Sequence, residues 1–144
     1  MKIKVINGPN LHMTGKRRPE VYGFETLDDI NAYLKKIAES DGAEISFFQS
    51  NSESEIIDAV WDCRGKYDGI IINAGAFTHY SYAIRDAIEG AEVPAIEMHM
   101  SNIAAREEFR HTSVLTPVCR GAVLGFGKKS YALALKYFTD GDIS

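Results

Sequence analysis

The stretch Gly69-Ile70-Ile71-Ile72-Asn73 is the part of the sequence that decides the fold class. Its three consecutive isoleucines are β-branched and favour a strand. A short strand that is apolar at successive positions is usually buried on both faces, as in a parallel sheet covered by helices. We therefore expect an α/β protein in which this segment is an interior strand of a parallel sheet.

Strand and helix patterns alternate on both sides of this segment. Thr26 is placed as the N-cap of a helix whose apolar residues recur every three or four positions until Gly42. Ser52 and Glu55 are three residues apart, as in a capping box that opens a second helix. The remaining expected elements are strands at 2–7, 44–49, 94–99 and 121–126, helices at about 80–90 and 128–139, and a long loop at 8–25.

Five strands that alternate with helices predict a parallel sheet with right-handed crossovers. We expect a flavodoxin-like three-layer sandwich with strand order 2-1-3-4-5, formed by residues 1–144 as a single catalytic domain. Ligands of such sheets bind beyond the carboxyl ends of the strands. The polar residues that follow each strand are therefore the candidates for function.

Composition narrows the class of protein. The 144 residues are 45% hydrophobic and 25% charged, which is ordinary for a globular chain, and the net charge of -4 argues against nucleic-acid binding. No apolar run is long enough to cross a bilayer, and residues 1–6 are typical of a strand rather than a signal peptide. Cys63 and Cys119 show neither metal-site nor disulfide spacing, so we expect reduced thiols in a cytoplasmic protein.

Polar side chains gather where three of the expected strands end. Because parallel strands end at the same edge of the sheet, these side chains should share one rim. A structural protein has little need for so many polar groups there, so the cluster indicates a site. Its members are Asn10, Asn73, His79, Glu97, His99 and Ser101.

The histidines of this rim allow more than one interpretation. Glu97 and His99 are two residues apart, so on a strand they share one face and the carboxylate can orient the imidazole of a general acid. A core histidine satisfied by hydrogen bonds fits the position equally well. His79 precedes a helix and could contact a ligand or act as a cap. A zinc site formed by these three residues is conceivable, but no compact metal motif supports it.

Two charged segments are further candidates. The loop at 8–25 is longer than is usual for such sheets and could act as a lid, and it carries Arg17 and Tyr22. A tyrosine can act as a base when a cation stabilises its phenolate, although a surface aromatic is the more common role. Arg106, Arg110 and His111 form either a solvated charged turn or a site that recognises anions or hydroxyls.

Several long motifs, spread over nearly the whole chain, resemble the type II 3-dehydroquinate dehydratase family. They are Asn7-Gly8-Pro9-Asn10-Leu11, Gly15-Lys16-Arg17, Pro19-Glu20-Val21-Tyr22-Gly23, Gln49-Ser50-Asn51-Ser52-Glu53, Asn73-Ala74-Gly75-Ala76 with Thr78-His79, Ser81, Arg85-Asp86-Ala87, Glu97-Met98-His99-Met100-Ser101-Asn102, Arg106-Glu107-Glu108-Phe109-Arg110, and Gly121, Gly125 and Gly127 with Tyr131-Ala132-Leu133-Ala134-Leu135.

The resemblance implies a lyase that dehydrates 3-dehydroquinate to 3-dehydroshikimate by anti elimination, without metal, cofactor or Schiff base. It implies Tyr22 as the base and Arg17 as the cation that stabilises its phenolate. His99 would be the general acid, oriented by Glu97, and a water near Asn10 would hold the enolate. The substrate contacts implied are Asn73, the backbone amides of Met100 and Ser101, His79, Arg110, and Asp86 from a neighbouring subunit.

The resemblance also implies a dodecamer built as a tetramer of trimers. Arg18 departs from the family pattern, because glutamate is common at that position, and this puts the rate in doubt rather than the reaction. A non-catalytic flavodoxin-like module is the main alternative. Its phosphoacceptor form would need acidic residues where Asn7 and Asn73 stand. A metal hydrolase at the two histidines and an inactive relative with the same fold are further alternatives.

Overall fold

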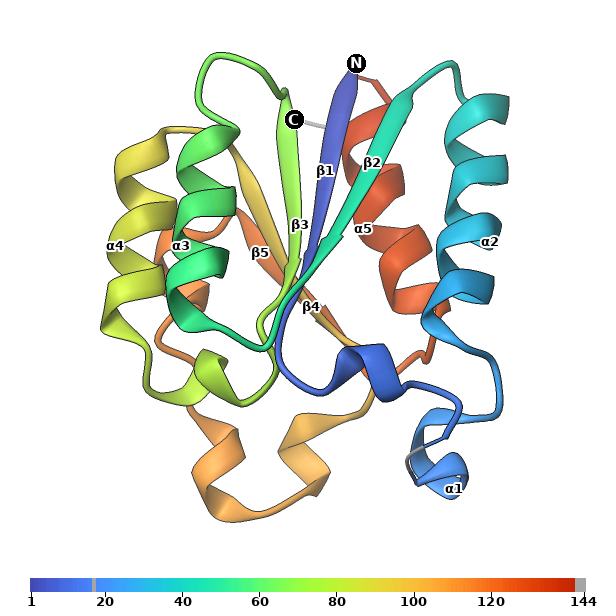
Figure 1. Ribbon diagram of the computed structural model, residues 1–144, viewed down its shortest axis with the longest axis vertical. Helices are drawn as coiled ribbons and strands as arrows, with labels where there is room; N and C mark the ends of the chain where they lie inside the picture. Colours follow the sequence, from blue (N-terminus) through green and yellow to red (C-terminus); the bar gives the residue numbers. More distant parts are fainter. Residues whose placement is uncertain (17, 142–144) are drawn as a thin grey trace.

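Five parallel strands form one sheet in the order β2-β1-β3-β4-β5 in the computed structural model, which describes residues 1–16 and 18–141 (Figure 1). The predicted strand order is confirmed. The strands are β1 (Lys2–Asn7), β2 (Glu44–Gln49), β3 (Gly69–Asn73), β4 (Ala95–His99) and β5 (Gly121–Leu124). All five residues of β3 are buried, as the run of isoleucines predicts.

Two layers of helices cover the sheet. Figure 1 shows α2 (Leu27–Ser40) and α5 (Lys129–Thr139) on one face, and α3 (Glu53–Asp62) and α4 (Tyr82–Ala91) on the other. The three-layer α/β architecture is therefore as predicted. No helix among the described residues is both long and apolar enough to cross a membrane.

Alternate residues along each strand belong to different cores, because side chains on a strand alternate between faces. Val5 and Ile71 pack with α2 and α5, whereas Ile6 and Ile72 pack with α3 and α4. The last residues follow the same alternation. Asn73 lies on the α5 face at the end of β3, and the alternation in β4 puts His99 on the opposite face. The carboxyl edge of the sheet therefore receives polar groups from both layers.

The helix caps agree with the predictions in one case and differ in another. The Thr26 side chain accepts a hydrogen bond from the Asp29 amide and caps α2. Ser52 caps α3 through the Glu55 amide, but the predicted capping box is only half formed. The Glu55 carboxylate instead accepts a 2.7 Å hydrogen bond from the Ser50 hydroxyl, and that hydroxyl accepts from the Ser52 amide.

The segment predicted as a loop at 8–25 contains two short helical pieces, so that prediction was incomplete. They are η1 (Leu11–Met13) and α1 (Pro19–Tyr22). Both are too short for apolar periodicity to reveal them. At the other end of the chain β5 stops at Leu124 rather than 126. Gly125 follows with φ 96°, which is outside the strand region.

A long connection after β4 lies beyond the carboxyl edge of the sheet, drawn in orange at the bottom of Figure 1. It contains the single turns η3 (Ile103–Ala105), η4 (Glu108–His111) and η5 (Thr116–Val118). The corresponding connection after β3 carries η2 (Gly75–His79). The turns η2, η3 and η4 and the segment after β1 surround the cavity described below, whereas η5 packs against α4.

Candidate active site

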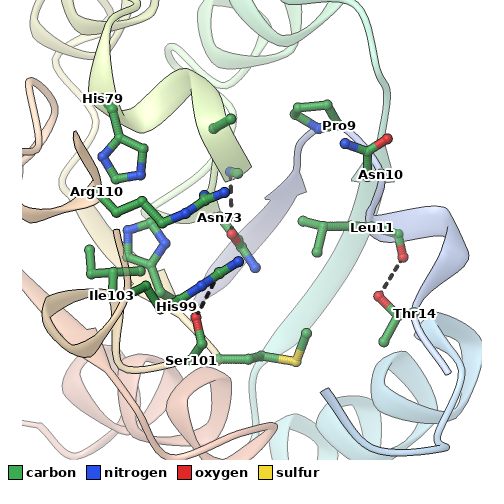
Figure 2. Close-up of a pocket in the computed structure, with 14 residues that line it drawn as sticks. Pro9, Asn10, Leu11, Thr14, Asn73, His79, His99, Ser101, Ile103 and Arg110 are labelled. Atoms are coloured by element: carbon green, nitrogen blue, oxygen red, sulfur yellow. Dashed lines mark hydrogen bonds between the residues drawn. The ribbon is translucent and has the colours of Figure 1, made fainter. Parts of the chain in front are cut away.

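A cavity of about 190 Å³ opens at the carboxyl edge of the sheet, where ligands of such folds bind (Figure 2). The segments after β1, β3 and β4 line it. In Figure 2 His79, His99 and Arg110 lie on one side and Pro9, Asn10 and Leu11 on the other. Its lining residues are Pro9, Asn10, Leu11, Thr14, Asn73, Gly75, Ala76, His79, His99, Met100, Ser101, Ile103, Arg106 and Arg110.

Glu97 and His99 form a buried pair at the end of β4. Oε2 of Glu97 lies 2.6 Å from Nε2 of His99, and only 1% and 6% of their side chains are exposed. The two-residue spacing puts both on the same face of the strand, as predicted. Because Nε2 faces the carboxylate, Nδ1 is the ring nitrogen that remains for exchange with a ligand in the cavity.

Two hydroxyls hold the other oxygen of Glu97. Oε1 accepts hydrogen bonds of 2.8 Å from Ser113 and 2.6 Å from Thr116, both in the connection before β5. Burial by itself raises the pKa of Glu97, but hydrogen bonds from His99, Thr116 and Ser113 outweigh it and hold the pKa below its usual value. Glu97 is therefore ionised at neutral pH and fixed in orientation.

The two cysteines, Cys63 and Cys119, pack on the face of the sheet covered by α3 and α4 and are not nucleophiles. Both cysteines are free, as predicted. Burial, with a further contribution from the Glu97 charge, raises the pKa of Cys119 to about 12. Burial likewise raises the pKa of Cys63 to about 11. Because the thiolate is the reactive form, both remain inert thiols at neutral pH.

His79 lies at the end of η2, where its ring packs beside His99. The two ring centroids are 6.5 Å apart at an interplanar angle of 15°. Nδ1 of His79 lies 2.8 Å from the carbonyl oxygen of Thr112 and must donate its proton there. Nε2 is then the atom that faces a ligand. Of the two roles considered from the sequence, the geometry favours ligand contact, because the α4 N-cap is Ser81.

The segment after β1 forms the facing wall. Asn10 has φ 70°, a left-handed conformation that asparagine tolerates better than most residues and that often marks functional sites. Its backbone amide donates to Oδ1 of Asn51 at 2.9 Å. Gly8 donates to the carbonyl oxygen of Asn73 at 2.7 Å, and a Cβ at Gly8 would lie only 2.7 Å from the Ala74 backbone. Glycine is therefore required for this close approach.

The connection after β4 contributes two arginine side chains and the residues that follow His99 to the cavity lining. Met100 and Ser101 line it next to His99, and an Nη1 atom of Arg106 donates to the Ser101 hydroxyl at 3.3 Å. Arg110 reaches the cavity with its guanidinium paired to Glu107 at 2.5 Å and stacked 4.6 Å from the Phe109 ring centroid. Two cations thus face the cavity, which favours an anionic ligand.

Three polar residues of this site were not singled out from the sequence. They are Thr14, which lines the cavity, and Ser113 and Thr116, which hold Glu97. Arg106 was expected, with Arg110 and His111, to form either a solvated charged turn or a site for anions or hydroxyls, and its position in the cavity lining favours the second. Serine and threonine 16 and 19 residues after Glu97 form no periodic pattern, so only the folded connection reveals their role.

The geometry described above does not include three of the predicted residues. Arg17 lies outside the described residues, and of Tyr22 only the backbone, at the end of α1, is described. Asp86 is exposed on α4 and is not among the lining residues of this cavity. Among the described residues, no group of three or more histidines, cysteines and carboxylates is arranged to hold a metal ion.

Taken together, the described residues can bind an anionic ligand and deliver a proton to it. The cavity offers an amide from Asn73, two guanidinium groups, and an imidazole from His99 that is backed by an ionised carboxylate. Such an imidazole can deliver a proton to a leaving oxygen while the amide and the cations hold an anion. A hydroxylated small molecule with a negative charge is the ligand class that fits.

Known proteins match nearly the whole chain in sequence and in structure. The family described as dehydroquinase class II matches residues 1–139. A Bacillus licheniformis protein named 3-dehydroquinate dehydratase is 52% identical over 136 residues, covering 94% of each chain. One of the same name from Clostridium beijerinckii is 53% identical over 137 residues, also covering 94% of each. The crystal structure of type II dehydroquinase from Butyrivibrio crossotus has a TM-score of 0.93 and 45% identity, covering 95% of this chain and 96% of that one.

Proposed function

Because this chain belongs to the dehydroquinase class II family, we propose that it removes water from 3-dehydroquinate to give 3-dehydroshikimate, a step of the shikimate pathway. The observation that carries the proposal is the buried Glu97–His99 pair at a cavity lined by Asn73 and two arginines. The substrate is a hydroxylated carboxylate, which is the class of ligand that this lining favours. Residues 1–144 would act as a single catalytic domain.

The first half of the proposed reaction forms an enolate. The Tyr22 phenolate takes the proton next to the ketone, and the electrons of that C–H bond move into the carbonyl. Arg17, five residues before Tyr22, stabilises the phenolate, and a water near Asn10 hydrogen-bonds the enolate oxygen. The resemblance of both motifs to the family supports these roles. The left-handed backbone of Asn10 at the cavity wall supports its part.

The second half expels water. The enolate returns its electrons, the bond to the leaving hydroxyl breaks, and His99 supplies the proton that makes water. Glu97 compensates the positive charge on the imidazole before that transfer, since its own pKa is lowered. Tyr22 and His99 act from opposite faces of the ring, which makes the elimination anti. The chemistry needs no metal or cofactor.

In this proposal one set of residues binds the carboxylate of the substrate and another set binds its ring hydroxyls. The Asn73 amide and the backbone amides of Met100 and Ser101 hold the carboxylate. His79 and Arg110 hold the ring hydroxyls, and the Nε2 atom of His79 is a hydrogen-bond acceptor for them when the ring is neutral. The support for these contacts is that all five residues line the same cavity.

We also propose that the protein works in the cytoplasm as a homo-oligomer, a dodecamer formed as a tetramer of trimers. Asp86 of one subunit would then reach the site of its neighbour. Its exposed position on α4, beside the largely exposed Tyr82, supports an interface there. Neither a nucleic acid nor a membrane is an expected partner.

The test is to mix the purified protein with 3-dehydroquinate and to follow the ultraviolet absorbance of the conjugated enone. We expect the absorbance to rise, and to rise equally with chelator present and after borohydride treatment. Quinate is the matched control: it lacks the ketone, has no acidified C–H bond, and should give no signal. A folded, oligomeric sample that leaves 3-dehydroquinate unchanged would overturn the proposal.

Deuterium placed stereospecifically at the carbon that loses its proton tests the anti geometry. We expect loss of only the label that lies anti to the leaving hydroxyl. Loss of the syn label would contradict the placement of Tyr22 and His99 on opposite faces.

A further inference from the structure

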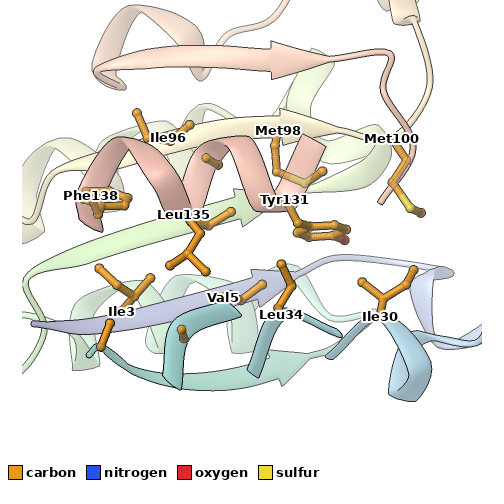
Figure 3. Close-up of a cluster of buried hydrophobic side chains, with 14 of the residues drawn as sticks. Ile3, Val5, Ile30, Leu34, Ile96, Met98, Met100, Tyr131, Leu135 and Phe138 are labelled. Carbon is orange, nitrogen blue, oxygen red and sulfur yellow. The ribbon is translucent and has the colours of Figure 1, made fainter. Parts of the chain in front are cut away.

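Tyr131 carries a buried hydroxyl that contacts Asn73 from outside the cavity, and the proposed reaction leaves it without a role. It belongs to α5 and is completely buried among apolar side chains such as Leu135 and Met98 (Figure 3). Its hydroxyl lies 2.6 Å from Oδ1 of Asn7 and 3.1 Å from Nδ2 of Asn73. A phenylalanine would fill the same space, so the hydroxyl itself calls for an explanation.

The two asparagines are partners at the ends of neighbouring strands. Asn7 ends β1, Asn73 ends β3, and the two stand opposite each other in the parallel register. Both are almost completely buried. Asn73 lines the cavity, whereas Asn7 is not among its lining residues. Tyr131 therefore connects an asparagine behind the site to one within it.

The number of available protons determines which group donates and which accepts in each of these hydrogen bonds. A tyrosine hydroxyl has one proton, and here it is donated to Oδ1 of Asn7. Towards Asn73 the hydroxyl can then only accept, so Asn73 must turn its NH₂ group to it. Burial raises the pKa of Tyr131, which keeps the phenol neutral and the direction unchanged at neutral pH.

The orientation of the Asn73 side-chain amide determines whether a donor or an acceptor faces a ligand in the cavity. Its Oδ1 accepts from the Gly75 amide at 3.4 Å, and one proton of Nδ2 goes to Tyr131. The second proton of Nδ2 is the donor that Asn73 brings to the cavity. With the amide reversed, Asn73 would present a carbonyl oxygen, which repels a carboxylate.

We infer that Tyr131 is a positioning residue that, held by Asn7, keeps the Asn73 amide in the orientation that donates to the substrate carboxylate. This inference rests on the proposed function, because it assigns the carboxylate to Asn73. It adds two residues outside the cavity to those that determine the preference for an acid.

Tyr131→Phe is the direct test, since it removes only the hydroxyl. We expect KM for 3-dehydroquinate to rise about tenfold, as for loss of a hydrogen bond to a charged group, with kcat within about twofold. The sharper readout is the ratio of kcat/KM for 3-dehydroquinate to kcat/KM for its primary carboxamide. That ratio should fall about tenfold, because a reversed amide can accept from the carboxamide NH₂.

Tyr67→Phe is the matched control. The Tyr67 hydroxyl is also hydrogen-bonded to a side chain, that of Ser46 at 2.8 Å, and neither residue lines the cavity. This variant should leave KM and the carboxylate-to-carboxamide ratio unchanged. A similar change in both variants would show a general effect of core polarity and would overturn the inference.

Asn7→Leu provides a second route if Tyr131→Phe does not fold. It leaves the tyrosine in place but removes the acceptor, so the Tyr131 proton becomes free to turn to Asn73 and reverse its amide. The same fall in the ratio is expected. An active wild type whose variants keep both KM and the ratio would overturn the positioning role alone. A wild type without turnover would overturn the proposed function, and this inference with it.

Discussion

Oε2 of Glu97 lies 2.6 Å from Nε2 of His99 with both side chains almost completely buried, and Oε1 of the same carboxylate accepts from Ser113 and Thr116. A buried carboxylate is costly unless its oxygens are hydrogen-bonded. These contacts offset that cost and hold the imidazole in one orientation, with Nδ1 turned from the carboxylate.

Thr116→Val should destabilise the protein through Glu97. It removes a 2.6 Å donor from a buried carboxylate without changing the side-chain shape, so we expect a loss of about 1–3 kcal/mol and a higher Glu97 pKa. Denaturant unfolding measures the free energy. Thr139→Val is the matched control, because that hydroxyl donates to the carboxylate of Asp41, which is only partly buried and is also paired with Lys136. An equal loss in both variants would contradict the special role of the buried contact.

Stability towards acid should depend on Glu97. Its pKa is lowered in the folded state, so its contribution is complete above the unfolded value near 4.5 and is lost as the pH falls through the folded pKa. The free-energy difference between wild type and Glu97→Gln should therefore shrink as the pH is lowered below 4.5. Exposed carboxylates with lowered pKa, such as Asp62, titrate in both proteins, so their contributions to this free-energy difference cancel. A difference independent of pH would mean that Glu97 is not ionised in the folded protein.

Tyr22→Phe should abolish most turnover and leave the fold intact. The substitution removes the proposed base, and general-base catalysis contributes about 10²–10⁴-fold to rate. Steady-state kinetics with 3-dehydroquinate measures the loss, and circular dichroism checks the fold. Tyr137→Phe, on the face of α5 away from the cavity, should keep full activity. A Tyr22→Phe enzyme with near-normal kcat would remove the tyrosine from the mechanism.

Arg110→Lys should weaken substrate binding more than it slows the reaction. The planar guanidinium is held by Glu107 and Phe109, and a lysine cannot reproduce that fork of donors. We expect KM to rise about tenfold, the cost of one charge-assisted hydrogen bond. Arg120→Lys, just before β5 at the amino edge of the sheet, is the control and should leave KM unchanged. An unaltered KM in Arg110→Lys would argue that Arg110 does not contact the substrate.

Local patterns were sufficient to predict the sheet. Three adjacent isoleucines indicated the buried strand β3, and the spacing of apolar residues after Thr26 indicated α2 with its cap. Glu97 and His99 could be paired because a strand has a fixed two-residue period. Each of these predictions depends on residues that are near neighbours in the chain.

Contacts between distant segments could not be predicted in this way. One local prediction also failed, because Ser50, which lies five residues before Glu55 and outside the capping-box pattern, donates to the Glu55 carboxylate. Thr116 is 19 residues from Glu97, and Tyr131 is 124 residues from Asn7. Such partners meet only when the connections pack at the carboxyl edge, and no periodicity of the sequence records that.

The most direct test of the proposed site is the turnover of 3-dehydroquinate by His99→Ala. Glu97→Gln serves as a companion variant, and the unfolding transition confirms that each protein is folded. We predict that His99→Ala loses most of kcat, because no other described group at the cavity is both an acid and oriented by a buried carboxylate. A folded His99→Ala protein with near-normal kcat would contradict the assignment of this cavity as the site of dehydration by His99.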